Sequence, residues 1–326
     1  MARIAVIMVN YNAAQLAISG IESVLKHDHP GHVVDIHVLD NASPLGDADV
    51  LQSAAEKSCW GDRVTLYRQT ENLGFGRGNN HVISALLERD EKPEFVFLLN
   101  PDAALENEAI AILADFMDAN PSVAVAGARI ESPEGDAVTA AFNFPSTISE
   151  FSSGVAFGPI DRLLARWRVP LSPDLPRRQV DWVAGAAMIA RVKALRQVNF
   201  FDPAYFLYYE EVDMMRRLKL AGWQTWFVPE AIAVHEEGRS TGVKSGESER
   251  RRLPLYLYES WRIYYLSQFG RASAIFTACC RVLGISLGHV IFSVRGRRPS
   301  APLMFYRDFY GIVIRPLLGL KAKHYD

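Results

Sequence analysis

Cysteine is scarce in this chain: only Cys59, Cys279 and Cys280 occur among its 326 residues. Three thiols, two of them adjacent, do not make a disulfide framework, and without a Cys-x-x-Cys pair a structural zinc site is not expected. A chain of this length buries roughly 75% of its unfolded surface, so its core needs neither kind of staple. We therefore expect an ordinary globular protein.

Three catalytic signatures are also missing. The sequence contains no His-Glu-x-x-His, which excludes a zinc protease of that class, and no Gly-x-x-x-x-Gly-Lys-Ser/Thr phosphate loop. No dinucleotide-binding fingerprint follows the first apolar run, and the glycine-rich segment 72–80 has Asn79 where that fingerprint needs its third glycine. The opening residues MARIAVIMVNYN hold one Arg and no small-residue cleavage site, so we expect no signal peptide and a cytoplasmic location.

Charge is unevenly distributed along the chain. From Arg250 onward there are 13 Lys and Arg against three acidic residues, whereas the preceding 249 residues carry 22 bases and 34 acids. A basic tail on an acidic front suggests an anionic partner such as a phospholipid, a lipid diphosphate or nucleic acid, although a merely solvated basic surface is the alternative. No nucleic acid is expected, because the bases accompany a long apolar segment and not a recognition motif.

That apolar segment covers residues 272–294 and has Arg281 near its middle. A central Arg costs about 2.5–3.5 kcal/mol on membrane-insertion scales. Thr277, Arg281, Gly284 and Gly288 follow one another at helical spacing and share one stripe, while the other faces are apolar. This favours an amphipathic helix at a membrane interface over a spanning one, and a helix packed on the rest of the protein fits nearly as well.

The first 130 residues alternate between strand and helix patterns. Short β-branched runs separated by amphipathic stretches predict βαβ units and a mostly parallel sheet. Strands are expected at 4–9, 33–39, 64–67, 95–99 and 123–128, with helices at 13–27, 47–57, 79–89 and 106–119. Between residues 131 and 180 the helical pattern is confined to about 160–167, so we expect loops and short strands on the acceptor side of a site. A helix at 210–221 and strands at 224–228 and 231–234 follow.

Ligands of parallel sheets bind beyond the carboxyl ends of the strands, which directs attention to the polar residues there. Three groups qualify: Asn10-Tyr11-Asn12, Asp40-Asn41-Ala42-Ser43 and Asn100-Pro101-Asp102. Asp102, after a buried strand, suits a hard cation, although an Asx turn or helix cap is an equal alternative. The glycine-rich segment 72–80 precedes a helix and could hold phosphate on its backbone amides.

Three acids open the helix at residue 210, and a lone histidine ends a short strand further on. Glu210, Glu211 and Asp213 would stabilise the helix dipole, or, as crowded like charges, raise one pKa and provide a general base. Two of them, Glu210 and Asp213, share a helix face, so they would orient Arg216 or Arg217 or cap the helix. A lone histidine such as His235 is more often structural than a ligand.

Taken together, the motifs resemble the inverting glycosyltransferases of family 2, particularly bacterial rhamnosyltransferase-like members. The resemblance runs from about residue 4 to 241. The matching pieces are VNYN at 9–12, DNAS at 40–43, NLGFGRGNN at 72–80, LLNPDA at 98–103, WVAGAAMIAR at 182–191, FDPAYFLYYEEVDMMRRLKLAGW at 201–223 and the histidine-to-Ser-Thr segment at 235–241.

This resemblance implies a GT-A (Rossmann-like) α/β fold, with a glycosyltransferase domain at 1–245 and a basic, helical, membrane-associating extension at 246–326. Tyr11 and Asp40 match positions that hold the nucleotide's base and ribose, and Trp182 and Gly185 lie in the segment that meets the acceptor. The residues expected to bind the donor are Asn10, Tyr11, Asn12, Asp40, Asn72, Gly74, Arg77, Asn80 and Asn100.

The resemblance also implies a divalent cation, Mg²⁺ or Mn²⁺, held by Asp102 as the last acid of the family's Asp-x-Asp motif and by His235. The second acid of the pair at 210–211 matches the catalytic base. The sequence departs twice from the family: Asn100 replaces the first acid of that motif, and Glu211 replaces the usual Asp. A base for the acceptor hydroxyl and a cation for the departing diphosphate are what an inverting transfer requires.

The sequence therefore predicts a metal-dependent inverting glycosyltransferase. Its expected donor is dTDP-rhamnose and its expected acceptor a lipid-linked saccharide of bacterial surface polysaccharide synthesis, met at the cytoplasmic face of the inner membrane. A UDP-sugar donor on the same fold is the nearest rival. A nucleotidyltransferase would need an N-terminal glycine-rich loop containing Arg, which VNYN lacks. An inactive membrane-associated scaffold would fit the replacement of the motif's first acid by Asn100, but it would not fit the retained Asp102, Glu211 and His235.

Overall fold

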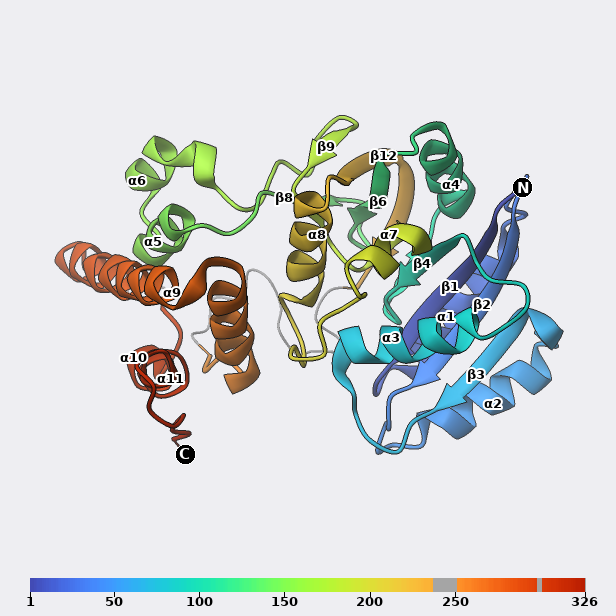
Figure 1. Ribbon diagram of the computed structural model, residues 1–326, viewed down its shortest axis with the longest axis horizontal. Helices are drawn as coiled ribbons and strands as arrows, with labels where there is room; N and C mark the ends of the chain where they lie inside the picture. Colours follow the sequence, from blue (N-terminus) through green and yellow to red (C-terminus); the bar gives the residue numbers. More distant parts are fainter. Residues whose placement is uncertain (237–250, 298–300, 326) are drawn as a thin grey trace. The chain divides into compact units, whose positions relative to one another are not determined.

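The computed structural model describes residues 1–236, 251–297 and 301–325 (Figure 1). The chain divides into two compact units. The first, here called the sheet unit, comprises Met1–Phe142, Pro170–Pro203 and Met214–Ser245; the second, the helical unit, comprises Asn143–Val169, Ala204–Asp213 and Gly246–Asp326. The helical unit thus takes up two segments from the middle of the chain. The boundary expected at residue 245 stays a prediction.

One mixed sheet organises the sheet unit, in the order β3-β2-β1-β4-β11-β6-β12-β5 over the described residues, with β7 beside β6 and β9 beside β12. A separate pair is formed by β8 and β10. The strands are β1 (Arg3–Asn10), β2 (Val33–Asp40), β3 (Val64–Arg68), β4 (Phe95–Leu99), β5 (Ala103–Leu105), β6 (Val123–Glu131), β7 (Ala137–Val138), β8 (Ala141–Phe142), β9 (Arg178–Val180), β10 (Trp182–Val183), β11 (Ala187–Arg191) and β12 (Gln224–His235).

Strand direction follows the predicted parallel pattern throughout the first half of the sheet and, in the second half, in the β6–β12 pair. Strands β1 to β4 are parallel neighbours, and all five strands expected before residue 130 are present. Their continuous apolar runs fit burial on both faces, as in β4, where every residue is buried. In the second half, β11 runs antiparallel between β4 and β6, and β12 is a single strand with an irregularity between Val228 and Ile232 where two short strands were expected.

Helices flank this sheet (Figure 1). They are α1 (Ala14–Lys26), α2 (Asp47–Lys57), α3 (Gly74–Leu87), α4 (Ala109–Ala119) and α7 (Val192–Gln197), with the 3-10 turn η1 (Gly61–Arg63) before β3. Helix α1 can lie close to the sheet because Gly20 has no Cβ. A Cβ at this position would stand only 2.7 Å from the carbonyl oxygen of Ala103. The glycine-rich segment is not the loop expected before a helix at residue 79. It forms the first turns of α3, which begins at Gly74 (φ 76°).

The helical unit contains α5 (Thr147–Val155), α6 (Gly158–Leu163), the 3-10 turn η2 (Ala165–Trp167), α9 (Leu255–Val294), α10 (Phe305–Phe309), the π-helical turn η3 (Tyr310–Ile314) and α11 (Arg315–Leu317). Helix α8 (Glu210–Leu220) begins in this unit and continues in the sheet unit. Helix α5 was not expected, because its sequence is rich in serine. A capping box in which Ser146 and Ser149 bond each other's backbone N–H starts it.

Helix α9 is long and kinked at Gly270, whose φ of 77° is open mainly to glycine. The stripe expected on residues 272–294 does share a face, and that face packs against α5. Thr277 shares a hydrogen bond of 2.7 Å with Thr147, and Arg281 pairs with Glu150. By length and composition α9 is the one helix in the described ranges that could cross a membrane, which is weak evidence by itself.

Candidate active site

The loops after β1 and β2 form a polar cluster at the carboxyl ends of these parallel strands. Asn10 and Asp40 are register partners and both are buried. The Asn10 Nδ2 donates to Asp40 Oδ1 at 3.1 Å and to Asp47 Oδ2 at 2.9 Å, and the Ala14 N–H donates to the same Asp47 oxygen. The Asn10 Oδ1, also buried, has no hydrogen-bond partner among the described residues. A donor on a ligand could satisfy this acceptor.

The two loops are also fastened to each other. Asn12 adopts a left-handed conformation (φ 54°), and its backbone N–H donates to Ser43 Oγ at 3.0 Å. Ser43 in turn donates its N–H to Asp40 Oδ2 at 3.3 Å, and Ala42 beside it is also left-handed. Left-handed backbone at non-glycine residues is strained, and both loops of this cluster contain one such residue. Tyr11 lies half-exposed between these fixed points.

The first turn of α3 is joined to this cluster through Asn41. Its amide donates to Asn72 Oδ1 (3.0 Å) and Gly74 O (3.2 Å) and accepts from the Leu73 N–H (2.9 Å). Arg77 bonds the Leu73 carbonyl through Nε only, which leaves its terminal nitrogens without a hydrogen-bond partner in the described part of the chain. Three of the expected donor-binding residues therefore adjoin the loop after β2.

Asn80, also expected to bind the donor, has a structural role in this geometry. Its amide donates to the Phe201 carbonyl at 2.7 Å and accepts from the Phe201 N–H at 3.1 Å, so both ends of the side chain are occupied. The expected acceptor residues pack on aromatic rings. Trp182 stacks on Phe142 with ring centroids 4.0 Å apart, and a Cβ at Gly185 would lie 3.3 Å from the Phe75 ring.

Asp102 and His235 meet although 133 residues separate them. Antiparallel pairing of β5 with β12 places His235 opposite Ala103, and its Nε2 lies 3.0 Å from Asp102 Oδ1. The Asp102 side chain is 1% exposed and that of His235 14%. Asn100 turns the chain here, because its carbonyl accepts the Ala103 N–H. The part of the family-like segment after Glu236 lies outside the described residues.

This pair fits a divalent cation in part. A carboxylate and an imidazole are both ligands of Mn²⁺, and Mg²⁺ commonly takes one or two carboxylates plus substrate phosphates and water. No group of three or more His, Cys, Asp or Glu residues that could hold a metal occurs in the ranges 1–236, 251–297 and 301–325. The two protein ligands would therefore need further oxygens, from water or a bound ligand, to complete a coordination shell.

The first residues of α8, with the three acids Glu210, Glu211 and Asp213, belong to the helical unit. Glu210 is buried, Glu211 is half-buried, and the Oε2 atom of each is shielded from solvent without a hydrogen-bond partner among the described residues. Burial, and then the charge of Glu211, raises the pKa of Glu210 well above its ordinary value; burial also raises the pKa of Glu211. Tyr208 and Tyr209, just before the pair, have φ of 67° and 70°.

Asp213 differs from the other two acids because its carboxylate is used in packing. Its Oδ1 accepts hydrogen bonds from Gln268 Nε2 at 2.6 Å and from Tyr205 Oη at 3.4 Å, which ties α8 to α9. Arg217, an expected partner of these acids, donates to the backbone carbonyls of Val198 and Phe200. Among the three acids, Glu210 and Glu211 therefore have the uncommitted oxygens.

Sequence reasoning missed Asp47 and the Glu150–Arg281 pair. Asp47 reads as an ordinary first-turn acid of a helix, yet it is 7% exposed and holds both Asn10 and the start of α1. The sequence carries no signal that separates Asp47 from other first-turn acids, because its burial is visible only in the structure. Glu150 accepts from Tyr265 Oη at 2.9 Å and pairs with Arg281, and both partners lie more than a hundred residues away.

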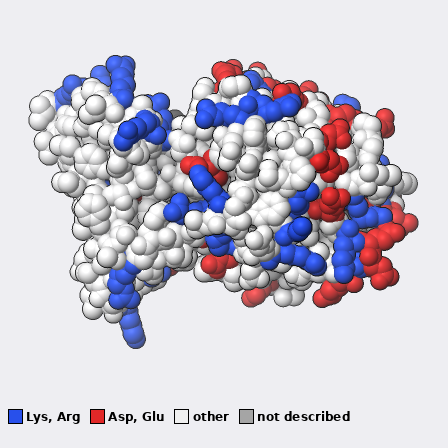
Figure 2. Space-filling view, turned by 45° about the horizontal axis from the view of Figure 1, so that its top comes forward, with Lys and Arg blue, Asp and Glu red and all other residues white. Residues whose placement is uncertain are grey.

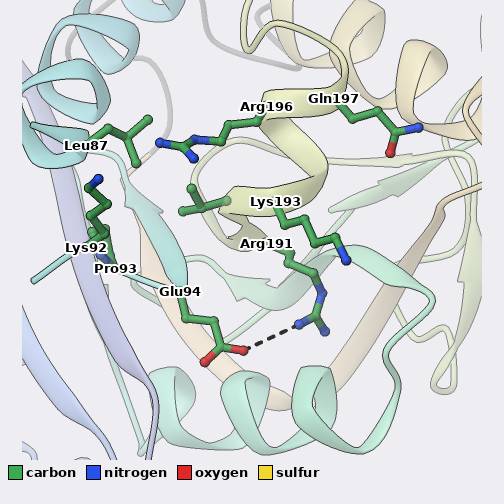
Figure 3. Close-up of a pocket in the computed structure, with 9 residues that line it drawn as sticks. Leu87, Lys92, Pro93, Glu94, Arg191, Lys193, Arg196 and Gln197 are labelled. Carbon is green, nitrogen blue, oxygen red and sulfur yellow. Dashed lines mark ion pairs between the residues drawn. The ribbon is translucent and has the colours of Figure 1, made fainter.

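A cavity of 640 Å³ in the sheet unit lies beside Glu94, at the opposite end of β4 from Asn100. Figure 3 shows the side chains that line it. Around it stand Lys92, Lys193 and Arg196, together with Glu94, whose carboxylate lies 3.7 Å from Arg191. Arg191 also donates to the Val123 and Met117 carbonyls, so it is part of the framework. None of the expected site residues lines this cavity.

Comparison with known proteins places the chain in a family. The model of the glycosyltransferase like family 2 matches residues 2–253, which is more than half of the chain. The chain belongs to glycosyltransferase family 2. It is therefore an enzyme that transfers sugar, as the motifs predict.

Two relatives of this glycosyltransferase are rhamnosyltransferases. The N-acetylglucosaminyl-diphospho-decaprenol L-rhamnosyltransferase of Mycobacterium tuberculosis is 31% identical over 218 residues, which cover 64% of this chain and 68% of that one. Rhamnosyltransferase WbbL of Escherichia coli K12 is 26% identical over 212 residues, 62% of this chain and 76% of that one.

Solved structures confirm the predicted GT-A fold. GalNAc-T7 with UDP, GalNAc and Mn²⁺ superposes with a TM-score of 0.63 at 12% identity, over 88% of this chain and 52% of that one. This chain thus spans about half of GalNAc-T7. The mannosyltransferase PcManGT of Pyrobaculum calidifontis, with GDP-Man and Mn²⁺, gives a TM-score of 0.55 at 14% identity, over 94% and 78% of the two chains.

Proposed function

We propose that this family 2 glycosyltransferase moves rhamnose from dTDP-rhamnose onto a lipid-linked saccharide, with inversion at the anomeric carbon and with a divalent cation. The observation that carries the chemistry is the pair of shielded, uncommitted carboxylate oxygens on Glu210 and Glu211. An inverting transfer needs one such base and no protein nucleophile. The two rhamnosyltransferase relatives, one named for a decaprenol-linked acceptor, support the transferred sugar and the lipid-linked acceptor.

In the proposed reaction, the acceptor hydroxyl oxygen forms a bond to the anomeric carbon while the bond from that carbon to the diphosphate oxygen breaks. Glu211 takes the hydroxyl proton on a carboxylate oxygen, and the electron pair of the broken bond leaves with the nucleoside diphosphate. Burial raises the pKa of Glu211, which makes its carboxylate a stronger base than an exposed one. Burial and the charge of Glu211 also raise the pKa of Glu210, so the pair would resist carrying two negative charges at once.

The donor would bind across the loops after β1 and β2. The Asp40 carboxylate would accept from the nucleoside, beside the unpartnered Asn10 Oδ1. Asp102 and His235 would hold the cation, which supplies charge neutralisation on the departing diphosphate. The terminal nitrogens of Arg77 are suited to the same anion. The protein would meet its acceptor at the cytoplasmic face of the inner membrane, bound peripherally to anionic lipid through its basic C-terminal part.

A donor screen tests this proposal. Release of nucleoside diphosphate would be measured with dTDP-rhamnose and with UDP-sugars, with a polyprenyl-diphosphate N-acetylglucosamine acceptor, in Mg²⁺, Mn²⁺ or EDTA. We expect acceptor-dependent release to be fastest with dTDP-rhamnose and to require the cation, and Glu211→Gln serves as the matched inactive control. Faster release from a UDP-sugar would show that the donor is that UDP-sugar and not dTDP-rhamnose. Equal release in EDTA would show that the transfer needs no metal.

A further inference from the structure

The second half of α9 carries a line of exposed apolar side chains, here called the outer stripe. Its members Phe276, Leu283, Leu287, Val290 and Val294 are 64%, 61%, 37%, 60% and 83% exposed. They follow one another at spacings of seven, four, three and four, which places them on one face of the helix. Single exposed apolar residues are common, but a continuous row on one face marks an interaction surface.

A second face of the same helix, about a third of a turn away from the outer stripe, is already occupied. Besides the Thr277 and Arg281 contacts, a Cβ at Gly284 would lie 2.4 Å from the Phe151 carbonyl oxygen, and one at Gly288 would lie 2.6 Å from that of Val155. This close contact with α5 fixes the rotation of α9 about its own axis. The outer stripe therefore points away from α5, and the helix cannot turn to bury it.

The charges around the outer stripe indicate which kind of surface it binds. Arg271 precedes it and Arg297 follows it, and both are exposed. In Figure 2 the visible surface of the helical unit is mostly white with blue patches, while red side chains gather on the sheet unit. A second copy packed on the stripe would bring arginines of the two copies together in the same apolar surroundings. An anionic lipid surface instead pairs apolar chains with the stripe and phosphates with the arginines.

We propose that residues 271–297 lie along the surface of an anionic bilayer, with the outer stripe in the outer part of the acyl layer and α5 on the water side. This rests on the proposed function, because it explains how the enzyme reaches a lipid-linked acceptor. The helix is long enough to span a membrane, but the Arg281–Glu150 pair and the covered α5 face would then leave water. A helix that lies along the bilayer surface keeps the Arg281–Glu150 pair on the aqueous side of the outer stripe.

Cys279 and Cys59 provide matched positions for an environment-sensitive fluorophore. Both are exposed, Cys279 lies on the outer stripe's face, three residues after Phe276, and Cys59 lies in the sheet unit. Each would be labelled with a nitrobenzoxadiazole dye in a chain whose other two cysteines are serine. With phosphatidylglycerol-containing vesicles we expect a blue shift and nitroxide-lipid quenching for the dye at Cys279 only, and stronger quenching by a nitroxide near the headgroup than by one at the bilayer centre.

Charge and stripe variants complete the test. Arg271→Gln and Arg297→Gln should each weaken vesicle binding about fivefold, because a basic residue at an anionic surface contributes roughly 1 kcal/mol. Leu283→Glu with Leu287→Glu should abolish binding while leaving transfer to a short water-soluble acceptor unchanged, which separates this proposal from the transfer itself. Equal spectra at both cysteines, stronger quenching at the bilayer centre, or a dimer in sedimentation that the double variant dissociates would each overturn the proposal.

Discussion

Replacing Glu211 by Gln removes the proposed base with little change of shape. The shielded Oε2 of Glu211 has no hydrogen-bond partner among the described residues, so the amide breaks no described bond of that atom. Loss of a general base lowers turnover by about 10²–10⁴-fold, which corresponds to about 3–5 kcal/mol in the activation barrier. We therefore expect turnover to fall by that factor while the donor's binding constant stays within about threefold, since donor contacts are untouched.

The assay for this prediction combines kinetics with titration. Initial rates of nucleoside diphosphate release would be measured for Glu211→Gln, Glu211→Asp, Glu210→Gln and Asp213→Asn, with donor binding followed by calorimetry. Glu211→Asp restores the usual family residue but shortens its reach by about 1 Å, so a partial loss is expected. Because burial raises the pKa of Glu211, the acid limb of the wild-type kcat/KM profile should lie above pH 4.5 and disappear in Glu211→Gln.

Three results would refute this reasoning. If Glu211→Gln stayed within a few-fold of the wild type while Glu210→Gln lost activity, the base would be Glu210. If Asp213→Asn alone were inactive at an unchanged melting temperature, its bond to Gln268 could not be its whole role. A fall in donor affinity equal to the fall in turnover would show that Glu211 acts in binding and not in proton transfer.

Three further predictions follow from the same contacts. Asp102→Ala should lower cation-dependent turnover about a thousandfold, measured against Mn²⁺ concentration; near wild-type rates would contradict the cation site. Glu210→Gln should be more stable to urea than the wild type above pH 4.5. The difference should grow as the pH rises towards the raised pKa of Glu210, and it should be absent at lower pH, where the Glu210 side chain is as neutral as Gln. A pH-independent difference would contradict the burial argument. Gly284→Ala should destabilise the protein by about 1–3 kcal/mol in urea unfolding, because its Cβ would meet the Phe151 carbonyl; an unchanged midpoint would contradict the close approach.

Local pattern was enough to predict the first half of the sheet. Continuous apolar runs such as Phe95–Leu99 can only be buried strands between amphipathic helices, and polar residues after them must gather at one edge. The meeting of Asn10 with Asp40 follows directly from parallel register. The insertion of β11 between β4 and β6 was not predictable in the same way, because nothing local in its five residues sets strand direction.

Long-range pairing accounts for what the sequence could not provide. His235 reaches Asp102 only because β5 and β12 pair, and the motif resemblance, not the spacing, suggested this partnership. Helix α5 has weak helix formers and depends on its capping box and on α9 for stability. The stripe through Arg281 was correctly grouped on one face, but its partner, Glu150, lies on a helix that the local pattern did not reveal.

The anomeric configuration of the product tests the central claim most directly. Transfer from dTDP-rhamnose to a polyprenyl-diphosphate N-acetylglucosamine acceptor would be followed by measuring the one-bond carbon–proton coupling at the new anomeric carbon. Direct displacement assisted by Glu211 predicts a single product whose anomeric configuration is opposite to that of the donor. A product with the donor's configuration would contradict the account, because retention requires a second displacement through a protein nucleophile, and the proposed reaction has one base and no nucleophile.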